Sequence, residues 1–577
     1  MSFKDSINYI KQLKYKQVAA LMLNPHVWMW VFPLLLIIPN VGLCITEFNS
    51  LMAKLTNIVL PFGVYLLLMT WSRKVGRTML LCLPIMILSA FQIVLFFLFG
   101  QSIIAIDMFM NVVTTNPAEA TELLGNLKVA ILTVCAFYLP PICVGVYMVI
   151  KKRRLSEPAR EKGRKAGVFI TVIGLVMMLF TWVFVDGFKP TREIFPYNVM
   201  SNVCTAVSRV YESMNYHKTS ASFSYTPMMT REKELVEIYV VILGETSRAA
   251  NWQLLGYDRE TNPRLSGRSN LVAFDKVLSE INTTHKSVPM LLSYLTSENF
   301  GDSVAHTRSV FSAFNDLGYQ TAFISNQRRN HSYIDFYGSE ARTVNFISDR
   351  GGPQLDMNLV EPLKKIIATS PSHKIFVVLH AYGSHFEYRK RYTPDMAYFT
   401  PEHNSQASAD NRQELINAYD NTIRYTDMFI NEVIKTLEET GEVASVIYVS
   451  DHGEDIFDDE RKRFLHSSPV PTANQIHVPM LVWTSDKFNE MFPERTAALK
   501  ANKSKDVSSS ISLFHTVIDM AGIKTPFYDN SKSLMSPGYS SPRRRYLNDY
   551  NESVELINSG LWNIDIDVLG RRGISVD

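Results

Sequence analysis

The chain has 577 residues, too many for a single hydrophobic core, so at least two domains are expected. Its formal net charge of +3 is small for this length and does not favour a nucleic-acid-binding protein. The larger C-terminal part can hold neither a disulfide framework nor a thiolate metal site, because every cysteine lies at or before position 204 (Cys44, Cys82, Cys135, Cys143 and Cys204).

The first third of the sequence contains successive apolar runs, each close to the roughly 20 residues that cross a bilayer. We expect membrane spans at 27–46, 55–72, 78–100, 128–150 and 167–187. The first run is too long for a signal peptide and further spans follow it. Buried helices of a soluble protein are the alternative interpretation, but so many consecutive apolar runs are hard to bury.

Lysine and arginine gather in alternate loops and indicate how these spans are oriented. Positive charge is concentrated in the N-terminal tail, in the loop 72–77 and in the segment 151–165, whereas the loops 47–54 and 101–127 are poor in it. The positive-inside rule therefore predicts a cytoplasmic N-terminus and places everything after about residue 188 outside the cytoplasm. The strict alternation argues against nucleic-acid binding by the basic loops.

Residues 188–234 are expected to bridge the membrane domain, 1–187, and the soluble domain, 235–577. Within the bridge, the stretch 197–214 mixes apolar and polar residues and can form an amphipathic helix on the membrane surface. A linker helix packed on the soluble domain is the alternative.

The soluble part alternates apolar strand-like runs with helical periodicity, which predicts an α/β fold with a mainly parallel central sheet. Ligands of such sheets bind at the carboxyl ends of the strands. Polar side chains follow the apolar runs there: Glu245 ends the first, His380 and His385 end another, and Asp451 and His452 end a third. The strand-like runs are 237–244, 321–325, 374–380, 444–450 and 478–483, and the helical run is 415–437.

Several of these side chains suit metal chemistry. Asp451 and His452 can supply oxygen and nitrogen ligands to a borderline metal such as zinc, although such a pair also occurs in ordinary turns. Glu245 adds a third candidate ligand unless it only caps the following helix. Thr284 is a poor nucleophile by itself, and metal coordination would stabilise its alkoxide. Its alternative role is a helix N-cap, and both roles are compatible because a helix N-terminus also favours phosphate.

His385 and His466 are isolated histidines in polar surroundings. They can bind phosphate and transfer a proton to a leaving or attacking oxygen. The alternative is an exposed histidine or one whose hydrogen bonds are satisfied in the core.

Together these motifs resemble those of the alkaline phosphatase and sulfatase superfamily, and within it the lipid A and lipopolysaccharide phosphoethanolamine transferases. The family's layout of five spans, a bridging segment and a sulfatase-like domain is also similar to the one expected here. The motifs are Gly244-Glu245-Thr246-Ser247-Arg248-Ala249, Leu255-Gly256-Tyr257, Thr284 with Ser287-Val288-Pro289, Asn417-Ala418-Tyr419-Asp420-Asn421 and Ser450-Asp451-His452-Gly453-Glu454.

The resemblance implies a Zn²⁺ site formed by Glu245, Thr284, Asp451 and His452, and it allows a second ion. It implies His385 and His466 as residues that bind the substrate phosphate or the second metal. A lysine of the family has no clean counterpart here, and the candidates to replace it in substrate binding are Arg328, Arg329 and His331.

The resemblance also points to one branch of the family. Lipid A-modifying members carry disulfides in the soluble domain, one of them around the nucleophile, whereas Glu280 and Met290 occupy the flanking positions here. The chain most resembles the enzymes that modify the heptose region of the lipopolysaccharide core.

The reaction implied by the resemblance is transfer of phosphoethanolamine from phosphatidylethanolamine to lipopolysaccharide. Thr284 would be the nucleophile, a phosphoethanolamine–threonine the intermediate, and His385 and His466 the acid and base. The enzyme would lie in the bacterial inner membrane with its catalytic domain, 235–577, in the periplasm. Neither a nucleic acid nor a protein partner is indicated.

Three other functions are alternatives to this one. A phosphoglycerol transferase of the lipoteichoic-acid or periplasmic-glucan type shares the spans and the metal ligands, but the Glu-Thr-Ser-Arg and Ser-Val-Pro contexts favour phosphoethanolamine. A sulfatase converts a cysteine or serine in a different context from that of Thr284. A non-catalytic membrane scaffold or transporter would not need the intact set of candidate ligands, and the spans hold few charges.

Overall fold

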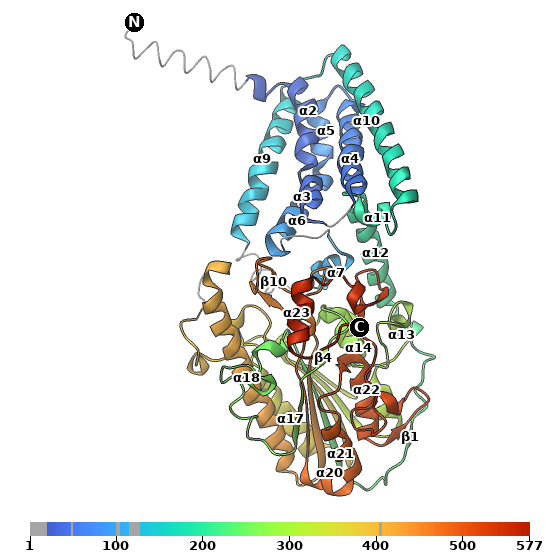
Figure 1. Cartoon of the computed structure of the whole chain (residues 1–577), viewed down its shortest axis with the longest axis vertical. Coiled ribbons are helices and arrows are strands. Elements are labelled where there is room, and N and C mark those ends of the chain that lie inside the picture. Colours follow the sequence, from blue (N-terminus) through green and yellow to red (C-terminus); the bar gives the residue numbers. More distant parts are fainter. Residues whose placement is uncertain (1–19, 48–49, 100–103, 115–126, 403–406) are drawn as a thin grey trace. The chain divides into compact units, whose positions relative to one another are not determined.

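The computed structural model describes residues 20–47, 50–99, 104–114, 127–402 and 407–577 (Figure 1). The chain divides into two compact units, one comprising residues 1–105 and 127–205, the other 106–126 and 206–577. The positive-inside prediction used the charges of the basic N-terminal tail and of the loop 101–127. The tail and most of this loop lie outside the described residues. The boundaries at 187 and 234 stay a prediction.

Apolar helices make up the first unit. Among the described residues, four helical stretches are long and apolar enough to cross a membrane, or five if a bent pair counts as one span. The bent pair, α5 and α6, forms an angle of 53° at its break. The stretches are Pro25–Thr46, which comprises α2 (Pro25–Leu36) and α3 (Ile38–Thr46), then α4 (Leu51–Trp71), α9 (Lys128–Ile150) and α10 (Glu157–Phe184); α5 is Val75–Leu81 and α6 is Leu83–Phe99.

The last of these helices differs most from its expected limits. Helix α10 begins at Glu157 rather than at 167, and it ends at Phe184 rather than at 187. Hydropathy detects only the apolar part of a helix, but Pro158 in the first turn after Ser156 is a local start signal that precedes a polar helical stretch. The expected third span, 78–100, forms the bent pair instead of one straight helix.

Glycines bring helices α4 and α10 into close contact. A Cβ atom at Gly174 would lie 2.6 Å from Leu60 Cα, and one at Gly63 would lie 2.6 Å from the backbone nitrogen of Thr171. Small residues let two helix backbones approach closely where no hydrophobic effect drives them together. The packing of this pair therefore depends on the absence of side chains at these positions.

The second unit is built on a seven-stranded sheet with the order β3-β11-β8-β2-β7-β5-β6. Strand β11 is antiparallel to both of its neighbours, and the other pairs are parallel. This confirms the mainly parallel sheet, although the run predicted at 478–483 forms the one reversed strand. The strands are β2 (Glu237–Gly244), β3 (Leu271–Phe274), β5 (Gln320–Ser325), β6 (Thr343–Phe346), β7 (Lys374–His380), β8 (Val443–Ser450) and β11 (Met480–Thr484).

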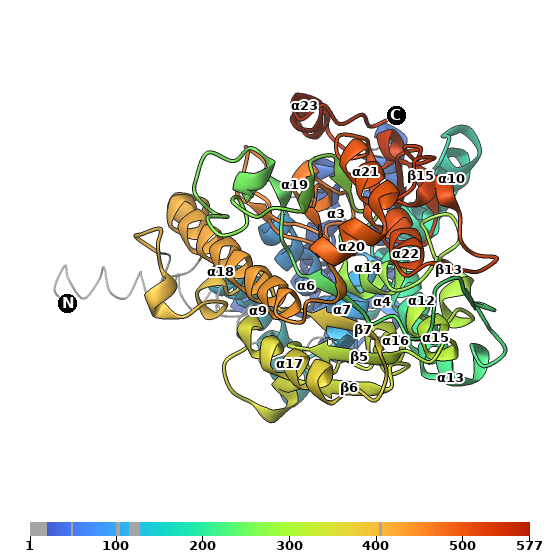
Figure 2. The same cartoon turned by 90° about the horizontal axis from the view of Figure 1, so that it is seen from below.

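Helices cover both faces of this sheet, as Figure 2 shows for α18 on one side and α15 and α16 on the other. Alternate residues of β2 enter two separate cores, Val240 on the side of α18 and Val241 on the side of α15. Burial on both faces explains why this strand reads as a continuous apolar run. One face carries α17 (Val360–Thr369) and α18 (Arg412–Glu438); the other carries α14 (Thr284–Leu291), α15 (Val310–Asp316), α16 (Tyr333–Gly338) and α22 (Ser509–Met520).

Two further helices, α12 and α7, lie in segments that follow apolar helices along the chain. Helix α12 (Tyr197–Met214) forms over the range predicted for an amphipathic helix, and its position at a membrane surface stays a prediction. Helix α7 (Ile106–Thr114) was not expected from the sequence. Although it follows α6 along the chain, it belongs to the second unit.

The close approach of α4 and α10 predicts a strong effect of Gly174→Leu. We expect this substitution to destabilise the apolar unit by about 1–3 kcal/mol, because the added side chain must displace the backbone at Leu60. Thermal unfolding of the purified protein in detergent measures the effect, with Val176→Leu on the exposed side of the same helix as the control. Equal unfolding temperatures for the two variants would contradict the packing argument.

Candidate active site

Three adjacent strands bring the predicted polar residues to one edge of the sheet. Strand β2 lies between β7 and β8 and runs parallel to both, with Leu243 opposite His380 and Gly244 opposite Ser450. The residues that follow these strands therefore emerge side by side. Glu245, Asp451 and His452 are all buried there.

Thr284 joins this group as the first residue of helix α14. The N-cap of the helix is Thr283, so the alternative role of Thr284 as the N-cap is wrong. Its Oγ1 lies 2.9 Å from His452 Nε2 and 3.2 Å from Glu245 Oε1. The helix start is tied to the end of β8, because the Ser287 hydroxyl donates to the carbonyl oxygen of Asp451 at 2.8 Å.

His452 presents one nitrogen to the carboxylates. Its Nδ1–H donates to the carbonyl oxygen of Gly453 at 3.0 Å, which leaves Nε2 with its lone pair. Nε2 lies 3.2 Å from Asp451 Oδ2 and 3.6 Å from Glu245 Oε1. A ring oriented by a carbonyl oxygen in this way is typical of a histidine that binds a metal.

Burial makes the charges of this group costly. It raises the pKa of Glu245 to about 6, with a contribution from the charge of Asp451, and it raises the pKa of Asp451 to about 7. Asp451 Oδ2 is buried and has no hydrogen-bond partner among the described residues. Two carboxylates in such a place are stabilised by a bound cation, so the donor set fits a metal ion.

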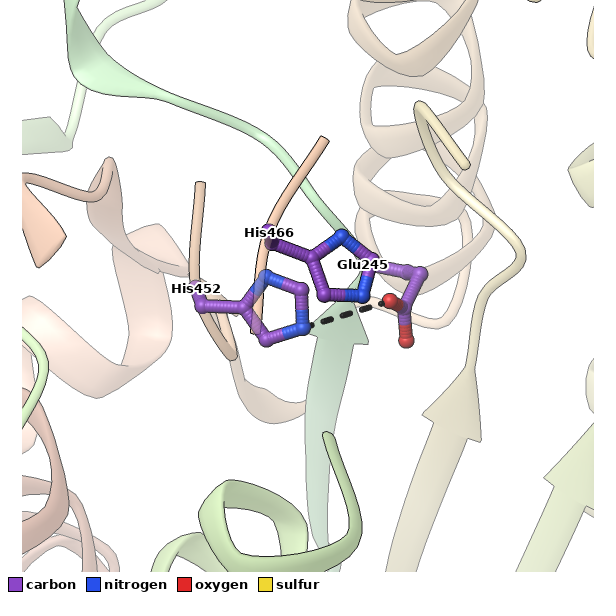
Figure 3. A group of neighbouring side chains, drawn as sticks. All are labelled: Glu245, His452 and His466. Carbon is purple, nitrogen blue, oxygen red and sulfur yellow. Dashed lines mark ion pairs between the residues drawn. The ribbon is translucent and has the colours of Figure 1, made fainter. Parts of the chain in front are cut away.

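The other two predicted histidines lie beside this group. Glu245, His452 and His466 each offer a ligand atom, and these atoms all lie within 4.8 Å of one another (Figure 3). The His385 ring lies 6.2 Å from that of His466, centroid to centroid. Burial, reinforced by the neighbouring histidines, lowers the pKa of His466 well below its usual value.

The candidates for the missing lysine do not join the group. Arg328, Arg329 and His331 are exposed, and Arg329 pairs with Asp349 at 3.2 Å. Their role in substrate binding stays a prediction. Instead, the amide of Gln327 donates from Nε2 to Glu245 Oε2 at 3.1 Å. The sequence offered one signal for Gln327, since it follows strand β5 and so lies at the same edge of the sheet.

Residues of two other motifs hold the loop that follows Glu245. The Tyr419 hydroxyl accepts from the backbone N–H of Arg248 at 2.9 Å and donates to the carbonyl oxygen of Thr246 at 2.8 Å. Asp420 accepts from the Tyr257 hydroxyl at 2.9 Å. These motif residues therefore support the site without entering it.

The backbone of Glu245 is held closely on its other side by Gly383. This glycine has φ +52°, and a Cβ atom on it would lie 2.5 Å from the carbonyl oxygen of Glu245. The next residue, Ser384, donates its backbone N–H to that same oxygen at 2.9 Å. Asp356 accepts from the backbone N–H of Gly383 at 2.9 Å and fixes the turn. Only glycine fits at position 383, and this requirement was not predicted from the sequence.

Two family models match the chain. The model described as phosphoethanolamine transferase EptA/EptB matches residues 60–213, and the one described as sulfatase matches residues 237–523. The two matches cover most of the first unit and most of the sheet-containing unit. They confirm the likeness inferred from the motifs.

Curated relatives carry the same activity in their names. Phosphoethanolamine transferase EptA of Escherichia coli (strain K12) is 27% identical over 511 residues, 86% of this chain and 92% of that protein. Kdo(2)-lipid A phosphoethanolamine 7''-transferase of the same strain is 30% identical over 306 residues, and the match spans about half of each protein, 50% and 52%.

A solved structure shares the fold of the chain. The integral membrane protein lipooligosaccharide phosphoethanolamine transferase A (EptA) from Neisseria meningitidis superposes with a TM-score of 0.70 and 22% identity, over 88% of this chain and 98% of that one. At this identity the likeness shows the fold, which agrees with the apolar helices and the sulfatase-like sheet described above. Taken with the matches to the two family models and the named relatives, the chain belongs to the phosphoethanolamine transferases.

Proposed function

We propose that this phosphoethanolamine transferase takes its group from phosphatidylethanolamine, holds it covalently on Thr284 and passes it to lipopolysaccharide. One observation carries the proposal: the Thr284 hydroxyl lies within hydrogen-bond distance of both His452 Nε2 and Glu245 Oε1. A hydroxyl that faces a base and a carboxylate at the carboxyl edge of the sheet has the surroundings of a nucleophile.

The ion that we propose for this site is zinc. Glu245, Asp451 and Thr284 offer oxygen ligands and His452 offers nitrogen, a set that suits four-coordinate Zn²⁺. A bound zinc ion would favour the alkoxide of Thr284 and neutralise charge on the phosphoryl oxygens. His466, with its ligand atom close to those of Glu245 and His452, lies where a second ion or the substrate phosphate would bind.

In the first step, Thr284 attacks the phosphorus of the lipid as the alkoxide, the form in which the second step releases it again, and the bond from phosphorus to the diacylglycerol oxygen breaks. The leaving oxygen takes a proton from His385 or His466, and diacylglycerol departs. In the second step, an acceptor oxygen gives a proton to the same histidine and attacks the phosphorus, which releases Thr284. His385 and His466 are neighbours at this edge of the sheet, and that supports their shared role in both steps.

The membrane helices support a lipid donor, since an enzyme whose chain enters the bilayer meets its lipid at the headgroup level. The basic loops 72–77 and 151–165 support an inner-membrane location with the N-terminus in the cytoplasm and the catalytic unit in the periplasm. For the acceptor we propose the heptose region of the lipopolysaccharide core, because the chain as a whole most resembles the members that modify it. Glu280 and Met290, which stand where lipid A-modifying members carry a disulfide, set the chain apart from that branch.

Replacing the nucleophile tests the covalent step. We expect Thr284→Ala to lower kcat for transfer by about 1,000-fold or more, because Thr284 carries the one hydroxyl among the described residues that lies within hydrogen-bond distance of both His452 Nε2 and Glu245 Oε1. Thr284→Ser, which keeps the hydroxyl, retains measurable transfer. Turnover of a fluorescent phosphatidylethanolamine in mixed micelles measures both variants. A kcat of Thr284→Ala within tenfold of the wild-type value would contradict the proposal. Turnover of phosphatidylglycerol alone would identify a phosphoglycerol transferase.

The tight contact at Gly383 predicts a loss of metal binding in Gly383→Ala. The added methyl group meets the Glu245 carbonyl oxygen and must displace this ligand, so we expect the zinc content of the purified protein to fall. Gly441→Ala is the matched control, since Gly441 also has a positive φ (+63°) but nothing within 4 Å of its Cβ position. Metal analysis that finds equal zinc in the two variants would contradict the assignment of Glu245 as a ligand.

A further inference from the structure

The two residues that follow Thr284 belong to a cluster of buried charges that has no role in the mechanism above. Lys286 Nζ lies 2.6 Å from Asp107 Oδ2, and His285 Nε2 lies 3.2 Å from Asp107 Oδ1. The side chains of Lys286 and Asp107 are each only 3% exposed. The two residues that follow Thr284 in the first turn of α14 are therefore both bound to a single carboxylate.

That carboxylate comes from helix α7, which is itself anchored at this point. Asp549 accepts the backbone N–H of Ile106 at 2.7 Å and thereby holds the start of α7. Arg209, on α12, lies 3.4 Å from Asp107 and donates to the carbonyl oxygen of Asp549 at 3.1 Å. Four segments that are distant in the sequence thus meet at Asp107, all of them within the second unit.

Asp107 is what makes the burial of Lys286 tolerable. Among the described residues, it is the one carboxylate within 4.0 Å of Lys286 Nζ. Burial and the charge of Asp107 raise the pKa of Asp549 to about 8. The oxygens of this second carboxyl group accept the backbone N–H groups of Ile106 and Asp107. Without Asp107, Lys286 would keep its bond to the carbonyl oxygen of Asn548 at 3.3 Å but would have no carboxylate beside it. A buried ammonium without a counter-charge is strongly unfavourable, so the loss of Asp107 favours either deprotonation of Lys286 or a shift of α14 that moves its side chain toward water. Thr284 lies two residues away and would move with it.

We propose that Asp107 is a positioning residue for the nucleophile. By binding Lys286 and His285, it holds the first turn of α14 so that Thr284 Oγ1 stays against His452 and Glu245. This inference rests on the proposed role of Thr284. It makes α7, which precedes the predicted catalytic domain 235–577 by more than a hundred residues, a working part of the active site.

A buried ion pair can instead serve stability alone, and the molecule offers a matched control for that alternative. Lys374 Nζ lies 2.6 Å from Glu237 Oε2, with side chains 4% and 0% exposed, so the pair equals Lys286–Asp107 in distance and burial. It lies at the amino ends of β7 and β2, opposite the edge that carries Thr284. Lys374→Met should therefore cost stability and leave the chemistry intact.

The experiment uses the full-length protein in detergent and compares Asp107→Asn, the double variant Asp107→Asn/Lys286→Met, Lys374→Met and Thr284→Ala. Thermal unfolding reports stability, and lipid turnover reports kcat and the KM for phosphatidylethanolamine. We expect Asp107→Asn to lower kcat by about 100-fold with little change in KM, because a nucleophile misplaced by about 1 Å slows the chemical step. The double variant, which leaves no unpaired lysine, recovers the unfolding temperature of the wild type but keeps the low kcat. Lys374→Met keeps the kcat of the wild type.

A double variant that recovers both the unfolding temperature and kcat would show that Asp107 serves stability alone, and it would overturn the inference even if Asp107→Asn fails to fold. An equal loss of kcat in Lys374→Met would do the same. Thr284→Ala separates this inference from the proposed function. If that variant turns over lipid, the proposed function fails; if it is inactive while the Asp107 variants have the kcat of the wild type, only the inference about Asp107 fails.

Discussion

The burial of two carboxylates against one imidazole is the constraint on which the rest of the site depends. Glu245 and Asp451 both face His452 Nε2 at the edge of the sheet, and Asp451 Oδ2 has no hydrogen-bond partner among the described residues. Such an arrangement is costly in a protein interior unless a cation compensates it. The adjoining strands, the glycine at 383 and the Tyr419 hydroxyl all act to keep these oxygens together, and Thr284 is the hydroxyl that they surround.

Much of the sheet and the group of candidate ligands could be predicted from the sequence, because both depend on local signals. A strand buried on both faces, such as 237–244, reads as an apolar run, and the polar residue that follows it lies at the binding edge. Gln327, Gly383 and Asp107 were missed because their importance arises from contacts with residues distant in the chain. A glycine in a turn and an acidic residue in a connecting segment carry no such signal in a single sequence, and for Gln327 the one signal is its place after strand β5.

The structure also shows how this chain holds the segment before Thr284, in a part of the sequence that has no cysteine. The Glu280 carboxyl group is buried and accepts from the hydroxyls of Ser297 at 2.6 Å and Ser510 at 2.5 Å. Burial raises the pKa of Glu280, and these hydroxyls offset part of that effect. A hydrogen-bonded carboxyl group thus joins three segments around Thr284. Together with the binding of α14 by Asp107, it makes the placement of Thr284 depend on several distant segments of the second unit.

The most direct test of the covalent mechanism is peptide mass spectrometry around Thr284, after zinc-loaded protein has been incubated with phosphatidylethanolamine in the absence of an acceptor. We expect a phosphoethanolamine adduct on Thr284, because the first step can proceed but the second cannot. Unmodified Thr284 in protein that still releases diacylglycerol would contradict the covalent mechanism, since the lipid would then be cleaved without passing through the threonine.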